Sequence, residues 1–161
     1  MSDWSNFCLG ELGAASALAG LLFVAVSVNQ GRILELGRMA DRGLEALIIL
    51  MVVVFIASLP LIPGQSPRIL GIEIATISAA ALATIVLLQR GYLRGLEPMY
   101  LRRSALLAAF NRFAVTLIIL AGLVLLWRGD SVGMYLLPPG VLFSFVAAGA
   151  NAWVLLIEIN R

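Results

Sequence analysis

The sequence predicts an all-α integral membrane protein, and three observations lead to this fold class. Hydrophobic residues make up 61% of the 161-residue chain and charged residues only 12%, whereas a soluble domain has about 25% charged residues. The mean hydropathy is +1.03. Five apolar stretches approach the ~20 helical residues that cross a bilayer. The chain is therefore predicted to be a single transmembrane helical domain over residues 1–161.

Charges and prolines set the expected bounds of the five transmembrane helices. Pro60 and Pro63 predict that the second helix bends or ends near Ile62, because proline lacks a backbone N–H and breaks the helix interior. Pro138 and Pro139 predict where the last helix begins, since proline is favoured in the first helical turn. The predicted helices cover roughly residues 9–30, 46–62, 69–89, 105–127 and 139–158.

The arginines predict how the helices are oriented in the membrane. Short loops rich in Lys and Arg stay in the cytoplasm. Only Arg68 and Arg128 lie in the second and fourth connections; the other loop and terminal arginines are Arg32, Arg38, Arg42, Arg90, Arg94, Arg102, Arg103 and Arg161. The amino terminus is therefore predicted outside and the carboxyl terminus in the cytoplasm. Aromatic anchors are expected at both interfaces: Trp4, Phe7, Trp127 and Tyr135 outside, Tyr92 and Tyr100 inside.

The two cytoplasmic connections are short and charged. Residues 31–47 alternate arginines and acids at three- and four-residue steps, which predicts a helical extension of the neighbouring spans or an interfacial helix. This segment is either a solvated connector or a docking surface for a membrane protein partner. The third connection, residues 90–103, is basic; it either touches anionic lipid headgroups or carries its charge for topology alone.

Several classes of chemistry lack the residues they need. The chain has no histidine and one cysteine, Cys8, which excludes histidine bases, Cys/His zinc sites, histidine-held haem and an intrachain disulfide. No metalloprotease, nucleophile-elbow or phosphate-loop motif is present. No catalytic residue, metal site, cofactor or nucleic-acid partner is therefore predicted. The first residues lack the basic region of a signal peptide, so the first apolar stretch is expected to remain in the mature protein.

Charges inside the membrane are the first candidates for function. Glu11 and Glu73 each lie about four residues into an outward-facing helix end, about 6 Å deep at 1.5 Å per residue, so the two are expected at one level. Thr76 and Thr84 follow Glu73 along one helix face. This polar face would suit the lining of a pore or cavity.

Arg112 is expected in the inner third of the membrane, because it lies about 22 Å along the helix from Trp127. Glu158 and Glu45 are expected at the same depth, and a structural ion pair with one of them is the favoured prediction. Snorkelling of Arg112 to the headgroups and a role in ion or proton movement are the alternatives. In the last helix Asn151 is expected to bond to another helix or to line a path.

Small residues line faces of two predicted helices, where they allow close contact between helix backbones. The third span carries Gly71, Ala75, Ala79 and Ala83 at steps of four, and the first carries Gly13, Ala17 and Gly20. These faces serve to pack the five helices, to form a homo-oligomer, or both.

Two segments carry a resemblance to a known family: GAASALAGLLFVAVSVNQGRIL in the first span and GMYLLPPGVLFSFVAAGANAWVLLIEINR at the end. In these segments the chain resembles a family of small, uncharacterised multi-spanning inner-membrane proteins of high-GC bacteria. Some members carry the label modulator of FtsH protease. The resemblance extends over essentially the whole length and implies a bacterial inner (cytoplasmic) membrane location, but it implies no chemistry.

The leading functional hypothesis is a non-enzymatic, homo-oligomeric membrane bundle that acts through helix-helix interaction. The alternative is a small ion channel or ion-coupled transporter whose path is lined by Glu73, Thr76, Thr84 and Asn151. An enzyme acting on lipid is a third and weaker hypothesis, because nothing in the sequence activates a nucleophile.

Overall fold

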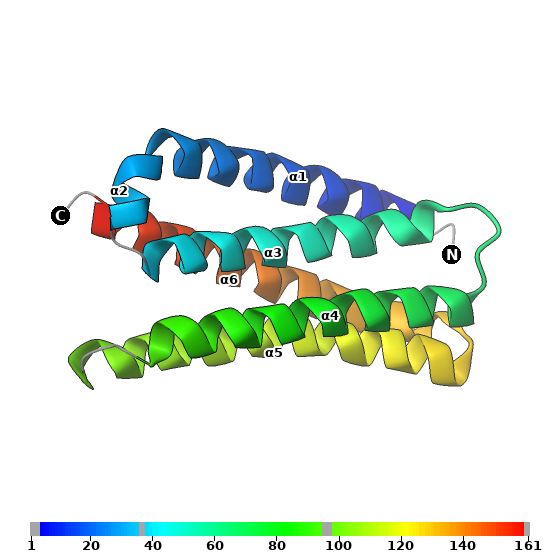
Figure 1. The fold of residues 1–161 in the computed structure, drawn as a ribbon. Helices are drawn as coiled ribbons and strands as arrows, with labels where there is room; N and C mark the ends of the chain where they lie inside the picture. The colour runs from blue at the N-terminus through cyan, green and yellow to red at the C-terminus, as the bar shows by residue number, and fades with distance from the viewer. Residues whose placement is uncertain (1–3, 36–37, 95–97, 160–161) are drawn as a thin grey trace.

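The computed structural model describes residues 4–35, 38–94 and 98–159, and every regular element within these ranges is a helix. Five long helices form a bundle (Figure 1): α1 (Ser5–Val28), α3 (Arg38–Ser58), α4 (Pro67–Leu93), α5 (Pro98–Arg128) and α6 (Leu137–Ile159). Three short helices connect them: α2 (Gln30–Glu35), η2 (Leu59–Leu61) and η3 (Ser131–Leu136). All five long helices contain a stretch long and apolar enough to cross a membrane. For the described residues, the predicted number of helices long and apolar enough to span a membrane is therefore confirmed.

Prolines end α3 and begin the two helices that follow connections at the same end of the bundle. After Ser58 the chain tightens into η2, and Ile62 is extended (φ −71°, ψ 120°) because Pro63 follows it. The hydroxyl of Ser66 then accepts a hydrogen bond from a backbone N–H in the first turn of α4, and Pro67 occupies that turn. Two more prolines occupy the first turn of α6. The predicted end near residue 62 and the start near residue 139 are both confirmed.

The helices are longer than the apolar stretches that predicted them. α4 continues to Leu93, and α5 already begins at Pro98, so most of the basic third connection is helical. The first connection is also largely helical, since it contains α2 and the first turns of α3. Arginine side chains at helix ends can reach past the apolar region, so charge does not stop a helix where it stops a hydrophobic stretch.

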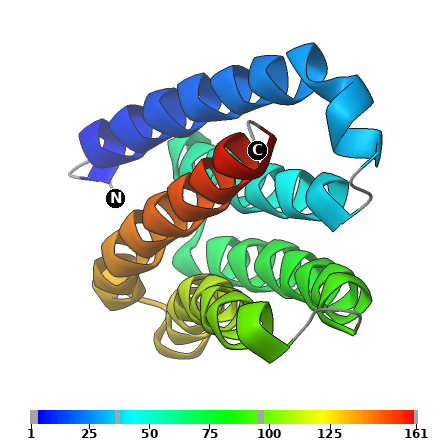
Figure 2. The ribbon, with the colours of Figure 1, turned by 90° about the vertical axis from the view of Figure 1, so that its left-hand side faces the viewer.

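α3 occupies the middle of the bundle and α1 the edge. α3 packs against α1, α4 and α6, while α5 packs against α4, α6 and η3. Figure 2 shows α1 along one edge of the bundle and the α4–α5 pair at the other. Only 17% of the most apolar window of α1 is buried, against 44% in α3. Most of α1 therefore faces away from the rest of the chain.

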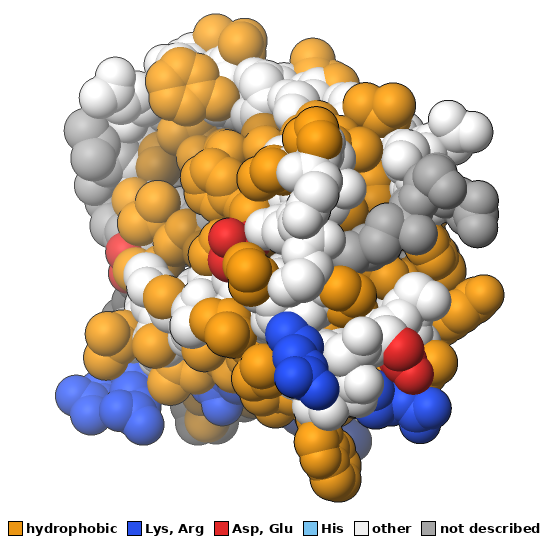
Figure 3. Space-filling view, turned by 90° about the vertical axis from the view of Figure 1, so that its right-hand side faces the viewer, with side chains coloured by type: hydrophobic (Ala, Val, Ile, Leu, Met, Phe, Trp, Pro, Cys, Tyr) orange, Lys and Arg blue, Asp and Glu red, His pale blue; other side chains and the backbone are white. Residues whose placement is uncertain are grey.

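The two ends of the bundle differ in charge. The α1–α3 connection, the α4–α5 connection and the end of α6 lie together (Figure 1), and we call this the arginine-rich end. The start of α1 and the connections around η2 and η3 form the opposite end, where hydrophobic side chains cover much of the surface and charged side chains lie mostly in the lower part of the view (Figure 3). α1 begins and α6 ends at opposite ends, as five spans require.

Aromatic side chains at the opposite end tie α1 to η3. The rings of Trp4 and Tyr135 meet edge to face with centroids 4.9 Å apart, and Trp4 meets Phe7 in the same way at 6.0 Å. Trp127 is highly exposed, as a membrane-interface anchor would be. The prediction that Tyr92 anchors the inner membrane interface is wrong, because this side chain is only 2% exposed and lies inside the bundle.

Candidate functional site

A buried carboxylate lies at the centre of the most polar part of the interior. Glu45 is on α3, two turns from the arginine-rich end, and its side chain is 0% exposed. Its Oε1 accepts hydrogen bonds from Gln89 Nε2 and Asn111 Nδ2, both at 2.6 Å, and its Oε2 accepts one from the Tyr92 hydroxyl at 3.0 Å. The donors come from α4 and α5, so one side chain joins three helices.

Gln89 connects this carboxylate to a cation. Its Nε2 donates to Glu45 and also to the backbone oxygen of Ala108 at 3.2 Å, while its Oε1 accepts a hydrogen bond from Arg112 Nε. Gln89 is completely buried. Both ends of the amide are therefore satisfied, with the guanidinium on one side and the carboxylate on the other.

A second arginine, Arg42, packs against Tyr92, which donates to the same carboxylate. Arg42 lies one helical turn before Glu45 on α3, is buried, and donates a hydrogen bond of 2.5 Å to the hydroxyl of Ser104 on α5. Its guanidinium carbon lies 5.1 Å from the centroid of the Tyr92 ring, which allows a cation–π contact. Arg42 and Arg112 thus each donate to a neutral polar side chain, Ser104 and Gln89 respectively.

This arrangement, which we call the Glu45 cluster, consists of Arg42, Glu45, Gln89, Tyr92, Ser104, Asn111 and Arg112. Three donors match an ionised carboxylate, which only accepts hydrogen bonds. One buried acceptor, Asn111 Oδ1, has no hydrogen-bond partner. The cluster contains no cysteine, and its serine, Ser104, contacts the Arg42 guanidinium, which donates hydrogen bonds and accepts none. No group of three or more acidic or cysteine side chains placed to hold a metal occurs in the described residues.

The prediction of a direct ion pair between Arg112 and Glu45 is wrong, because Gln89 lies between the two side chains. The two residues do face the same buried region, but the amide stands between them and no contact of 4 Å or less joins their charged groups. Among the described side chains, the one ion pair is Arg128 with Asp130, at 3.2 Å in an exposed turn. The side chain of Glu158, the other expected partner, lies outside the described part of the chain.

The two outer carboxylates are not brought together. Glu73 accepts a hydrogen bond from the side chain of Gln65, which precedes α4. Glu11 is partly buried on α1, and Figure 1 shows α1 and α4 on different sides of α3. The two carboxylates therefore occupy separate surroundings, on helices that lie on different sides of α3, and do not meet within one copy of the chain.

The polar face that follows Glu73 points out of the bundle. Thr76 and Thr84 are both exposed, and their hydroxyls donate to backbone oxygens one turn earlier in α4, at 2.8 and 3.0 Å. Such internal bonds satisfy a hydroxyl even in lipid. Within one copy of the chain these residues therefore do not line an interior path.

Asn151 is buried, but its amide bonds within its own helix. Its Nδ2 donates to Ala147 O at 3.0 Å, and Ser144 Oγ likewise donates to Gly140 O at 2.8 Å. The expected bond from Asn151 to another helix is not present among the described residues. Ser144 and Asn151 of α6 therefore lie in the interior without joining helices by hydrogen bonds.

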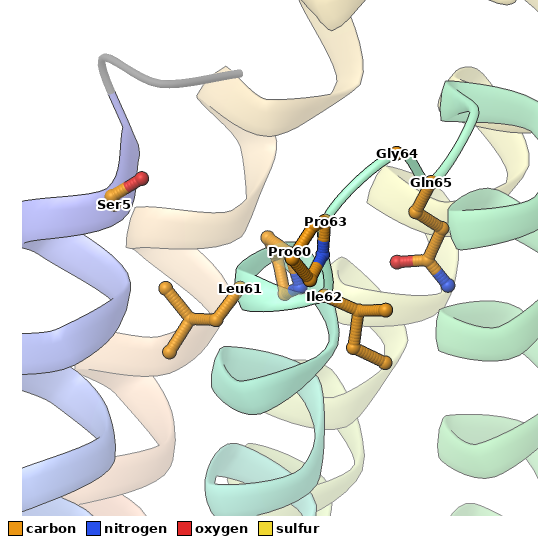
Figure 4. A pocket seen from close by; sticks show the side chains of 7 residues that line it. All are labelled: Ser5, Pro60, Leu61, Ile62, Pro63, Gly64 and Gln65. Carbon is orange, nitrogen blue, oxygen red and sulfur yellow. The ribbon is translucent and has the colours of Figure 1, made fainter.

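Two surface hollows add to this picture. One, of about 240 Å³, lies at the opposite end between Ser5 of α1 and residues 60–65 (Figure 4), where the side-chain oxygen of Gln65 points toward Ile62. The other, of about 340 Å³, lies between α5 and α6 near the arginine-rich end. Neither is lined by the residues that were expected to form a path.

The sequence pointed to two members of the Glu45 cluster and missed the others. Glu45 and Arg112 were singled out as charges in or near a span, whereas Gln89 and Asn111 were not. Both amides interrupt apolar runs, as Asn151 does, and a polar residue in such a run indicates a buried partner. Tyr92 gave no such signal, because an aromatic residue near a span end looks the same whether it faces lipid or the interior.

Comparisons with protein-family models, curated proteins and solved structures returned no match. The function is therefore argued from the geometry of this chain.

Proposed function

We propose that the chain spans a membrane as a five-helix bundle and acts, without catalysis, by associating with a second copy through the outer face of α1. The observation that carries this proposal is a set of glycines with open space in front of them. A Cβ added at Gly10, Gly13 or Gly20 would meet nothing within 4 Å. These residues, together with Ala17, are exposed along one side of α1.

The exposed small residues lie opposite the side of α1 that packs on the bundle. The buried residues of α1 are Cys8, Ala15, Ala19 and Leu22. At 100° per residue these point away from Gly13, Ala17 and Gly20 by roughly half a turn. One face of α1 thus holds the helix to its own chain, and the other is free for a second helix.

The glycines between α4 and α5 show how this chain uses small residues where helices meet. A Cβ at Gly71 would lie 2.5 Å from the backbone nitrogen of Leu126, and one at Gly122 would lie 2.7 Å from that of Ala75. There the two backbones touch. Helices in lipid associate by such close contact, so a similar set on α1 with nothing against it favours an interface that one copy leaves open.

The Glu45 cluster supports the structural part of the proposal. Its charged groups bond to neutral polar side chains, with Gln89 between Arg112 and Glu45, and it contains no reactive group. Such a cluster fixes α3, α4 and α5 and leaves α1 as the outward-facing element. By the positive-inside rule, the arginine-rich end would face the cytoplasm, and the membrane would be the bacterial inner membrane that the family resemblance implies.

An ion channel or transporter remains the second candidate. It would require several copies, because Thr76 and Thr84 lie on the outside of α4. A ring of copies could place these hydroxyls around a shared path. The homo-oligomer through α1 is favoured because the threonine hydroxyls already have partners, whereas the space before the α1 glycines is open.

Energy transfer between labelled copies tests the proposal. Donor- and acceptor-labelled protein is mixed in liposomes, and transfer is followed as lipid is added to dilute it. We expect Gly13→Leu to lower transfer several-fold at equal dilution. Gly149→Leu is the matched control, because Gly149 on α6 is also exposed with nothing within 4 Å of a Cβ. Equal transfer in the two variants, or transfer that falls to the random level in the unaltered protein, would refute the proposed interface.

A further inference from the structure

The hollow between α5 and α6 has a charged end and an apolar wall. It is lined by Arg103, Leu106 and Leu107 of α5 and by Ala150, Trp153 and Val154 of α6. It opens to the outside, since Arg103 and Leu106 are exposed and the Trp153 side chain is 63% exposed. We call it the α5–α6 groove.

The polarity of the groove runs along the helix axis. Arg103 lies about one turn, or 5 Å, nearer to the arginine-rich end than Leu106 and Leu107. Trp153 lies near the same end of α6, where an indole N–H commonly meets the membrane interface. The groove therefore offers cationic and hydrogen-bonding groups at headgroup depth and apolar side chains directly below them.

We propose that the α5–α6 groove binds an anionic glycerophospholipid, with its phosphate on the Arg103 guanidinium and one acyl chain along Leu106, Leu107 and Trp153. The argument is charge complementarity: a guanidinium forms paired hydrogen bonds with a phosphate. Basic pockets between transmembrane helices commonly bind anionic headgroups. This inference rests on the proposed insertion in a bilayer, but not on association through α1.

The size and the surroundings of the groove favour a lipid over other occupants. A volume of about 340 Å³ can hold a hydrocarbon chain. It is too small for another helix, which with its side chains is about 10–12 Å across. The hollow at the opposite end has no charged residue among those that line it. The same apolar chain could rest there, but no cation would select its headgroup.

Trp153 lines the groove and is therefore a direct probe of its occupant. The test uses protein in which Trp4→Phe and Trp127→Phe leave Trp153 as the one tryptophan, reconstituted in phosphatidylcholine vesicles. Brominated phosphatidylglycerol or brominated phosphatidylcholine is added at the same low mole fraction. Bromine quenches tryptophan at contact. We expect the anionic lipid to quench Trp153 at least threefold more effectively than the zwitterionic one.

Two arginines form the matched comparison. Arg102 is exposed, carries the same charge and precedes Arg103 by one position, but points about 100° away around α5 and does not line the groove. Arg103→Ala should abolish the preference for the anionic lipid, and Arg102→Ala should retain it. Ala150→Phe, which fills the groove while keeping Arg103, should also abolish it.

The outcomes separate this inference from the proposed membrane bundle. Protein that does not float with the vesicles would overturn the bundle and the lipid site together. Protein that floats and is quenched equally by both lipids, or loses its preference equally in the two arginine variants, would overturn the lipid site alone. No quenching by either lipid would mean that a protein surface covers the groove, and this too would overturn the proposal.

Discussion

Gly71 of α4 and Gly122 of α5 face each other where the two helix backbones touch: a Cβ at Gly71 would lie 2.6 Å from the carbonyl oxygen of Gly122. No real Cβ approaches a backbone atom so closely. The contact therefore sets the distance between the two helices at the opposite end, as the Glu45 cluster holds them at the arginine-rich end.

Adding a methyl group at this contact should push α4 and α5 apart. We expect Gly71→Ala and Gly122→Ala each to lower the free energy of unfolding by about 1–3 kcal/mol, as overpacking does. Gly20→Ala, in the same type of helix but with open space around the new methyl group, should not lower it. Unfolding in mixed detergent micelles measures the difference. Equal losses at all three positions would show that the close contact between α4 and α5 is not what holds the pair.

Removing the central carboxylate should leave several buried groups without partners. We expect Glu45→Ala to lower the free energy of unfolding by about 3–5 kcal/mol, the range seen when one member of a buried charged network is removed. Glu45→Gln should lose less, because its oxygen still accepts and the Tyr92 hydroxyl can accept in turn. Glu11→Ala is the control, since Glu11 is only partly buried on the outer helix. A loss at Glu45 no larger than at Glu11 would contradict the role of the cluster.

Gln89 should matter more than its lack of charge implies. Gln89→Leu keeps the size of the side chain but removes the link between Arg112 and Glu45. Leaving a buried polar group unpaired costs about 1–3 kcal/mol, and more for charged groups, so we expect a loss above that range. Gln65→Leu provides the comparison, because Gln65 bonds to Glu73 beside an open hollow. If the two substitutions shift thermal unfolding equally, Gln89 is not the link between the charges.

The α1 interface should be open to crosslinking between copies. In a Cys8→Ala background, which removes the one native thiol from a buried site, we expect Ala17→Cys to form a disulfide-linked dimer on mild oxidation in native membranes. Ala109→Cys, at an exposed position of α5, should remain largely monomeric. The dimer band on a non-reducing gel reports the result. Comparable dimer bands from both positions would indicate random collision in the membrane.

Helix number and helix ends could be predicted because they depend on local chemistry. Apolar length predicted five helices long enough to span a membrane, and the prolines at 60, 63, 138 and 139 predicted where helices end and begin. The extra turns of α4 and α5 were missed because hydropathy falls where arginines begin, although the backbone continues as a helix. A bilayer sets the minimum length of a helix that crosses it, and the length of an apolar stretch can be read directly from the sequence.

Partners inside the bundle could not be predicted in the same way. Depth along a helix placed Arg112 and Glu45 at one level, but two charges at one level can meet directly or through a third group. Which occurs depends on how α3, α4 and α5 rotate about their axes. The small residues show the same limit: Gly71 is used inside the bundle while Gly13 faces outward, and spacing alone does not separate them.

The hydrogen bonds of Glu45 have a consequence for how the chain is made. Its nearest partner in sequence is 44 residues later and its farthest is 66 residues later. At about 5–20 residues per second of synthesis, Asn111 is made roughly 3–13 seconds after Glu45. For roughly the first 2–9 seconds, until Gln89 is made, α3 carries a carboxylate without any of these partners. Near the end of the helix this side chain can stay in contact with water at the membrane surface. The packing of α3 around Glu45 is therefore completed only after α4 and α5 have been made.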